Sequence, residues 1–272
     1  MRFWFFSRES ENLKHTFIRE KSLCRRNCRY KEVDLFEYSE EEQQAVRNTR
    51  RTKTRASLPK IKKLNNDYSR KFFRWLLFNN FGKDDYHLTL TFEDEISKEA
   101  AGRELTNYIQ RLRRCYKKHC VPLKYMYVTE DKRSGSRRHY HIVLSGGVPR
   151  DEIENKWHNG WANVDRLKPD KKDGLFGLSK YLTKSKKYCD KFERSWNCST
   201  NLKRPDVVTD DNRISKKRMR QLLNAKRNDE VKTEVEKLYK GWLLIDSEID
   251  HNPVTGRPFA RLRLIRRKQE AR

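Results

Sequence analysis

The stretch YMYVTEDKRSGSRRHYHIVL, residues 125–144, decides the fold of the central part of the chain. Two runs rich in β-branched and aromatic residues flank a polar turn centred on Ser134 and Gly135, and this pattern predicts a β-hairpin. In the second run, His139 and His141 are two residues apart. Side chains at that spacing on a strand point to the same face, so the hairpin presents both imidazoles together.

An acidic side chain of the first run falls in register with these histidines. With the turn centred between Ser134 and Gly135, Glu130 lies directly opposite His139, and cross-strand partners share a face. A register shifted by one residue would instead place Glu130 on the other face. In the predicted register, two imidazoles and one carboxylate form an open-sided site for a divalent cation.

The segments around the hairpin complete an α+β pattern. Residues 86–92 alternate apolar and polar side chains as a half-buried strand does, and Ser97 is placed to cap a helix that runs to about residue 118. A short helix at 151–157 and a strand at 160–167 follow the hairpin. The order β-α-β-β-α-β predicts a ferredoxin-like antiparallel sheet with two helices on one face and the other face free for a site.

A basic helix is predicted after the fourth strand, over residues 174–188. Tyr181, Lys184 and Tyr188 form a stripe at positions i, i+3 and i+7, beside an apolar stripe of leucines. Such a stripe is also typical of a helix whose tyrosines are purely structural. Further along, residues 214–239 predict one or two helices, and residues 241–265 predict a terminal β-hairpin.

The composition indicates a partner that carries many negative charges. The 272 residues include 64 Lys and Arg against 38 Asp and Glu, a formal net charge of +26. A basic run at residues 47–63 suits phosphate contacts. No signal peptide or membrane-spanning stretch is visible, so we expect no membrane association. The six cysteines are expected as free thiols, and the Cys24-x-x-x-Cys28 pair lacks a second pair spaced for a zinc site.

Three features occur in a fixed order along the chain: the strand Leu88–Phe92, the pair His139 and His141 with Glu130 upstream, and Tyr181-x-x-Lys184 on a helix. In this order they resemble the His-hydrophobe-His (HUH) endonuclease superfamily of rolling-circle replication initiators, and within it the replication-associated proteins of phages and plasmids. The resemblance covers about residues 86–205. Glu130 lies farther from the histidines than in some members, and no Gly-x-x-x-x-Gly-Lys-Ser/Thr loop of a helicase is present.

The resemblance implies a function and a set of site residues. Glu130, His139 and His141 would hold Mg²⁺ or Mn²⁺, and Tyr181 would attack single-stranded or hairpin origin DNA to form a 5′-phosphotyrosine. Lys184 would position the phosphate or stabilise the phenolate, and Tyr188 is a second candidate nucleophile. A helicase of the host would unwind the DNA, and the protein would act in the cytoplasm, with a bacterial host expected. The oligomeric state is left open.

The same resemblance divides the chain into a basic N-terminal extension over residues 1–80, an HUH endonuclease domain over 81–205, and a charged helical segment with a terminal hairpin over 206–272. Two alternatives stay open. An HUH transposase would share the site, whereas relaxases usually carry the tyrosine ahead of the histidines. A non-catalytic RNA-recognition module shares the β-α-β-β-α-β order but needs an aromatic strand motif that this hairpin lacks.

Overall fold

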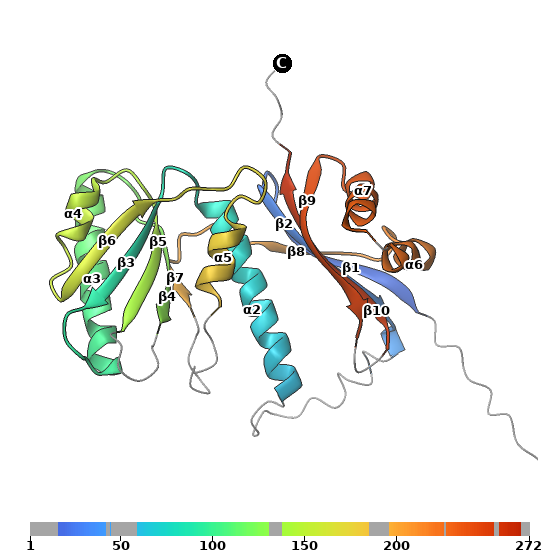
Figure 1. The fold of residues 1–272 in the computed structure, drawn as a ribbon, viewed down its shortest axis with the longest axis horizontal. Coiled ribbons are helices and arrows are strands. Elements are labelled where there is room, and N and C mark those ends of the chain that lie inside the picture. Colours follow the sequence, from blue (N-terminus) through green and yellow to red (C-terminus); the bar gives the residue numbers. More distant parts are fainter. Residues whose placement is uncertain are drawn as a thin grey trace, which may run out of the picture. The chain divides into compact units, whose positions relative to one another are not determined.

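A computed structural model of the chain describes residues 16–41, 44, 59–130, 138–184, 196–225, 227–252 and 256–267. The chain forms two compact units, each built on one five-stranded sheet (Figure 1). The site unit comprises Cys24–Lys31, Pro59–Asp206 and Ile265–Arg272. The terminal unit comprises Met1–Leu23, Glu32–Leu58 and Val207–Leu264. Within the described residues, no helix has the length and apolar character needed to cross a membrane.

The site unit contains the elements expected around the hairpin and three more. Its elements in chain order are α2 (Pro59–Asn80), β3 (Tyr86–Phe92), α3 (Lys98–Lys118), β4 (Tyr125–Glu130), β5 (His139–Leu144), α4 (Arg150–Glu154), β6 (Gly160–Arg166), α5 (Phe176–Leu182) and β7 (Asn197–Cys198). The strand order is β6-β3-β5-β4-β7. The run from β3 to β6 has the β-α-β-β-α-β order, so the prediction of an α+β fold with a ferredoxin-like core is confirmed.

The two faces of this sheet differ because side chains alternate along each strand. On β3, Tyr86, Leu88, Leu90 and Phe92 are buried in the core with α3 and α4, whereas His87, Thr89 and Thr91 point the other way. Ser97 caps α3 as predicted, and its hydroxyl accepts a hydrogen bond from the backbone N–H of Ala100. Figure 1 shows α3 and α4 against one face of the sheet and α5 toward the other.

Two details of the site unit differ from the sequence-based expectation. The sheet has a fifth, two-residue strand, β7, which pairs with β4. Helix α5 ends at Leu182, two residues before Lys184. The hydroxyl of the next residue, Thr183, donates to the carbonyl of Ser179, and the helix stops there. The expected helix over 174–188 is therefore shorter, and residues 185–190 lie outside the described part.

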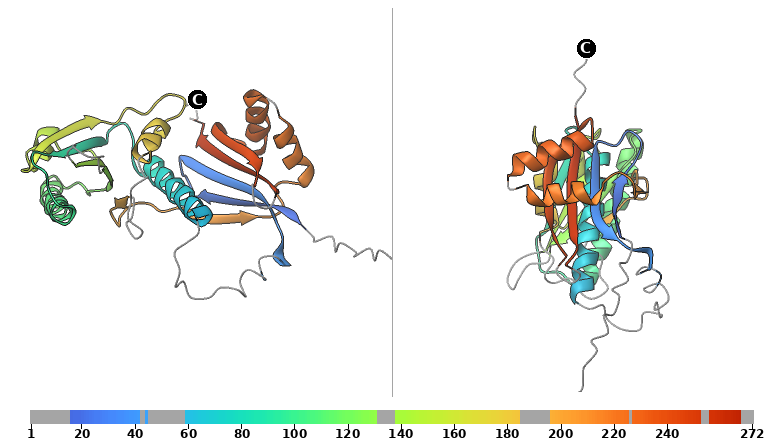
Figure 2. Two further views of the ribbon diagram at one scale, coloured as in Figure 1. Left: turned by 60° about the horizontal axis from the view of Figure 1, so that its bottom comes forward. Right: turned by 90° about the vertical axis from the view of Figure 1, so that its right-hand side faces the viewer.

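The terminal unit collects strands from both ends of the chain. Its elements are β1 (Phe17–Cys24), β2 (Tyr30–Tyr38), β8 (Asp206–Asp210), α6 (Lys216–Asn224), α7 (Asn228–Leu238), β9 (Trp242–His251) and β10 (Pro258–Arg266), in the sheet order β8-β1-β2-β10-β9. The expected helices and terminal hairpin are confirmed. Figure 2 shows α6 and α7 on one face of this sheet, where their apolar side chains join its core.

The first 45 residues show no clear period in the sequence, yet they supply β1 and β2. The period is hidden because a charged residue occupies a core position. Glu20 on β1 is only 3% exposed. Its carboxylate accepts a hydrogen bond from the Tyr239 hydroxyl at 2.8 Å and pairs with Arg213 at 3.1 Å. A buried charge with partners of this kind is tolerated in a core, but it interrupts the apolar pattern by which a strand is predicted.

Gly160 at the start of β6 offers a test of the packing. Its φ is +134°, and an added Cβ would lie 2.4 Å from the Thr91 carbonyl oxygen and 2.5 Å from the Glu93 nitrogen. We expect Gly160→Ala to destabilise the fold by about 1–3 kcal/mol. The matched control is Gly102→Ala, inside α3 with open space around it, which should be stabilising by up to about 1 kcal/mol. Thermal unfolding of the two variants would contradict this packing if both shifted in the same direction.

Candidate metal and tyrosine site

The antiparallel pairing aligns the predicted site residues in rows across the sheet. Trp161 of β6 pairs with Thr91 of β3, Thr91 with His139 of β5, and His139 with Glu130 of β4. We call these four residues the site row. The observed register therefore agrees with the predicted one, in which Glu130 lies opposite His139. The adjacent row on the same face contains Thr89 and His141, which are also direct partners.

Glu130 and His141 are in contact across this register. The Glu130 carboxylate lies 3.0 Å from Nε2 of His141, so it reaches diagonally to the neighbouring row. His141 is 8% exposed, whereas the Glu130 side chain is 33% exposed, so one partner is buried and the other borders solvent. His139 lies on the same face and contacts Thr91. The roles of Glu130, His139 and His141 as metal ligands stay a prediction.

Both histidines meet a threonine of β3 through the same ring nitrogen. Nδ1 of His139 lies 2.7 Å from Oγ1 of Thr91, and Nδ1 of His141 lies 3.3 Å from Oγ1 of Thr89. A threonine oxygen that accepts the Nδ1 proton fixes the ring and its tautomer, and the lone pair is then on Nε2. Partners of this kind behind a ligating histidine orient the ring and raise its basicity. The two threonines therefore suit histidines that bind a metal through Nε2.

The observed distances fit a divalent cation. Metal bonds of about 2.1 Å in an octahedral site place neighbouring ligand atoms about 3.0 Å apart. The separation between Nε2 of His141 and the Glu130 oxygen is 3.0 Å. These two residues could therefore become neighbouring ligands with little movement.

Helix α5 brings Tyr181 to the same nitrogen. The Tyr181 hydroxyl lies 3.5 Å from Nε2 of His141, and the two rings meet edge to face with centroids 5.4 Å apart. Tyr181 is 53% exposed, which is unusual for a large aromatic side chain and leaves its hydroxyl accessible. Lys184 follows the helix, and its backbone N–H bonds to the Tyr181 carbonyl at 3.2 Å. Tyr188 lies outside the described residues.

The position of α5 depends on α2, which the sequence did not connect with the site. Leu182 and Phe176 of α5 are buried, and the two helices are in contact. Just before α5, Gly174 has φ of +60° and faces the ring of Phe78 on α2 so closely that an added Cβ would lie 2.8 Å from it. Glycine is therefore required for the turn that starts α5. This long-range packing sets where Tyr181 lies.

His87 is a further member of this face that the sequence analysis did not single out. Its ring stacks on His141 with centroids 5.5 Å apart and planes 10° apart. Burial, followed by the proximity of His141, lowers the pKa of His87 to about 4, so the ring is neutral near neutral pH. His87, Thr89 and Thr91 share one strand parity, and that alternation is the signal that could have identified all three.

A change at Thr91 tests whether the threonines support ligation. Thr91→Val keeps the β-branched shape and removes the oxygen that faces Nδ1 of His139. We expect Mn²⁺ affinity, measured by isothermal titration calorimetry, to fall about 10- to 100-fold. The control is Thr129→Val on β4, which pairs with Tyr140 and points to the opposite face. Unchanged affinity in Thr91→Val, or an equal loss in Thr129→Val, would contradict the assigned role.

Comparison with known proteins gives one match, which covers the site. Residues 85–186 match a family model of replication-associated proteins, the ORF2 family. The matched segment runs from just before β3 to just past Lys184, so it includes Thr89, Thr91, Glu130, both histidines and Tyr181, and stops short of Tyr188. No curated protein and no solved structure gives a match. The family match supports a role in the initiation of replication.

Proposed function

We propose that the site unit nicks and rejoins single-stranded origin DNA through a covalent bond to Tyr181, in the rolling-circle replication of a phage or plasmid. One observation carries the proposal: the Tyr181 hydroxyl and the Glu130 carboxylate both approach Nε2 of His141, at 3.5 and 3.0 Å. Sequence reasoning selected these residues from separate segments, and the fold brings them to one atom. They also lie within the segment that matches a replication-associated family.

Glu130, His139 and His141 would hold the divalent cation, either Mg²⁺ or Mn²⁺. Two imidazole nitrogens and one carboxylate suit Mn²⁺ better than Mg²⁺, which prefers oxygen ligands throughout. A cation bound there would polarise the scissile phosphate and stabilise the negative charge that develops on its oxygens. The open side of the site, where Glu130 borders solvent, is the side from which a phosphate could approach.

Tyr181 supplies the nucleophile in this proposal. Its phenolic oxygen forms a bond to phosphorus, the bond from phosphorus to the 3′ oxygen breaks, and the leaving oxygen takes up a proton to become a free 3′-OH. The phenol must lose its own proton, and its usual pKa of about 10 calls for a nearby base or cation. His141 Nε2 and Glu130 are the closest described groups that could accept it. Attack by a 3′-OH reverses the step and rejoins the strand.

The site row offers a surface for a base beside the scissile phosphate. Trp161 is 54% exposed and shares the row with Thr91 and His139. Two strand spacings, about 10 Å, separate it from His139. Aromatic rings on an exposed sheet face are stacking platforms for unpaired bases. We therefore propose that a nucleotide next to the cleavage point stacks on Trp161.

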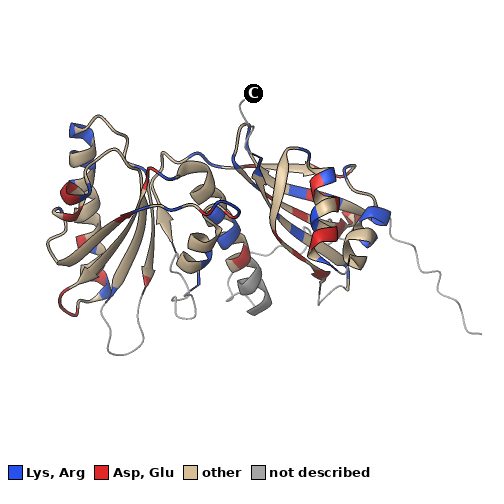
Figure 3. Cartoon of the chain, turned by 45° about the horizontal axis from the view of Figure 1, so that its top comes forward, with Lys and Arg blue, Asp and Glu red and all other residues tan. Residues whose placement is uncertain are grey.

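Basic residues around the sheet would hold the DNA backbone. Figure 3 shows the strands of the site unit nearly devoid of Lys and Arg, which lie instead on helices and connecting loops. Phosphate contacts from such residues give affinity, whereas the uncharged sheet face leaves room for the bases. Lys184, just past α5, is placed by the chain to reach the phosphate that Tyr181 attacks. A helicase would have to come from a partner, because the sequence carries no nucleotide-binding loop of its own.

The covalent step is tested by trapping the adduct. An oligonucleotide carrying the origin, labelled on the side that stays attached to the tyrosine and incubated with Mn²⁺, should give an adduct that resists denaturing detergent. Tyr181→Phe should reduce the adduct to background, because the only atom removed is the attacking oxygen. The control is Tyr68→Phe, an α2 tyrosine that is 51% exposed and should change nothing. Tyr188→Phe should also keep the adduct. An adduct that persists in Tyr181→Phe would overturn the assignment.

Stacking on Trp161 is tested by binding of single-stranded DNA. Trp161→Ala should weaken affinity about 5- to 150-fold, which corresponds to about 1–3 kcal/mol for one stacked base. Trp161→Phe keeps an aromatic face and should retain most of the affinity. Fluorescence anisotropy at fixed salt gives the dissociation constants. Equal binding by wild type and Trp161→Ala would show that the base lies elsewhere.

A further inference from the structure

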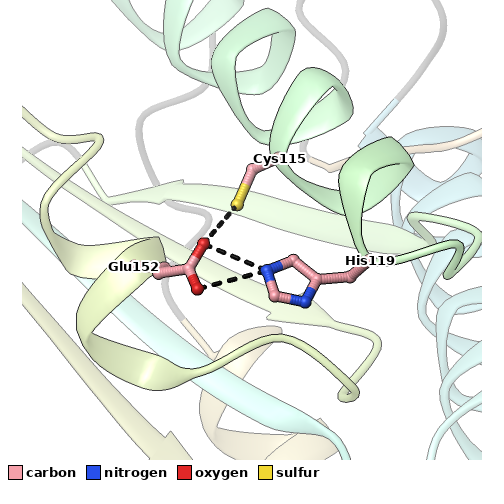
Figure 4. A group of neighbouring side chains, drawn as sticks. All are labelled: Cys115, His119 and Glu152. Carbon is pink, nitrogen blue, oxygen red and sulfur yellow. Dashed lines mark hydrogen bonds and ion pairs between the residues drawn. The ribbon is translucent and has the colours of Figure 1, made fainter.

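A second group of ligating side chains lies on the opposite, helix-covered side of the site unit (Figure 4). Cys115 stands near the end of α3, His119 is the residue that caps this helix, and Glu152 lies on α4. One ligand atom from each residue lies within 4.8 Å of the others. The Cys115 thiol donates to the Glu152 carboxylate at 3.4 Å, and Nε2 of His119 lies 3.1 Å from both carboxylate oxygens.

The packing of α3 against α4 fixes this arrangement. Cys115 and His119 are four residues apart, so they project from the same side at the end of α3. Around them, Tyr108 of α3 donates to the carbonyl of Ile153 at 3.0 Å, and Arg111 donates to the carbonyl of Lys156 at 2.9 Å. Both bonds tie α4 and the residues just after it to α3. The three ligating groups are therefore held together by backbone elements and not only by their own contacts.

We propose that Cys115, His119 and Glu152 bind a zinc ion. Zinc bonds of about 2.3 Å to sulfur and about 2.0 Å to nitrogen and oxygen, in tetrahedral geometry, place the oxygen about 3.3 Å from the nitrogen and about 3.5 Å from the sulfur. The observed separations are 3.1 Å and 3.4 Å. A thiolate, an imidazole and a carboxylate also form a donor set that suits zinc, whereas Mg²⁺ and Mn²⁺ favour oxygen-rich sites.

Binding exchanges one proton for the ion. Without metal, the thiol proton of Cys115 occupies the space between sulfur and the Glu152 oxygen. Zinc is ligated by the thiolate, so the thiol proton is released to solvent as the zinc–sulfur bond forms. Lys156 and Lys118 lie near enough to favour the thiolate electrostatically. No oxidant or other reactant is required.

The proposed ion would act as a clamp between α3 and α4. The side chains of His119 and Glu152 are 32% and 42% exposed, so water can reach the fourth tetrahedral position. The cluster belongs to the helical layer, whereas His139 and His141 belong to the opposite face of the sheet. The zinc site is therefore independent of the proposed nicking site, and its failure would leave that proposal intact.

Cobalt(II) provides a direct test because it replaces zinc and absorbs light in a way that reports thiolate ligation. The full-length wild type, titrated with Co²⁺, should develop a sulfur-to-cobalt charge-transfer band that added Zn²⁺ abolishes. Cys115→Ser should lose the band. Three controls should keep it: Cys120→Ser, five residues further on; Cys24→Ser with Cys28→Ser, the other close thiol pair; and His139→Ala with His141→Ala, which removes the other metal candidate.

A second measurement covers the case in which cobalt binds differently from zinc. Zn²⁺ should raise the melting temperature of the protein carrying His139→Ala and His141→Ala, and adding Cys115→Ser or Glu152→Gln should remove this rise. Circular dichroism confirms that each variant is folded. No cobalt–thiolate band in the wild type, or a band that survives Cys115→Ser, would overturn the proposal. The three side chains would then form only a hydrogen-bonded cluster.

Discussion

The antiparallel register of β3, β5 and β4 is the constraint on which the candidate site depends. Side chains alternate between the two faces of a sheet, so a shift by one residue would move both histidines into the apolar layer under α3. The observed register instead pairs Thr91 with His139 and Thr89 with His141, and sets Glu130 at the end of the same row. Thr89 and Thr91 are thus the structural counterpart of His141 and His139: each threonine oxygen meets Nδ1 and leaves Nε2 toward Glu130 and Tyr181.

Sequence reasoning reached the parts of this arrangement that depend on local spacing. Alternation along residues 86–92 and 139–144 predicted two strands, and the turn position predicted the pairing of Glu130 with His139. Tyr181 came from a resemblance, and its approach to His141 could not be derived from spacing because it depends on the packing of α5 against α2. The contact of Gly174 with Phe78 joins residues almost a hundred positions apart, and no local pattern encodes it. Strands β1 and β2 were missed for a related reason, since the buried Glu20 is satisfied by residues from the far end of the chain.

The two sides of the site unit present different ligand chemistry. The open face of the sheet carries nitrogen and oxygen groups beside an exposed tyrosine and an exposed tryptophan, which suits chemistry on a polyanion. The helical layer carries a sulfur, a nitrogen and a carboxylate at tetrahedral spacing, with no exposed aromatic ring among them. The first arrangement suits a reaction and the second suits a clamp. The family match includes both, because α3 and α4 lie between β3 and α5 in the chain.

The central claim is that one metal lies beside the Tyr181 hydroxyl, held by the face that β3 supports. Anomalous diffraction from crystals of the full chain soaked in Mn²⁺ tests it most directly, because it locates the ion without reference to activity. The account predicts a manganese peak within coordination distance, about 2.1 Å, of His139, His141 and Glu130. A fully occupied manganese peak elsewhere in the molecule, with none at these three residues, would contradict it.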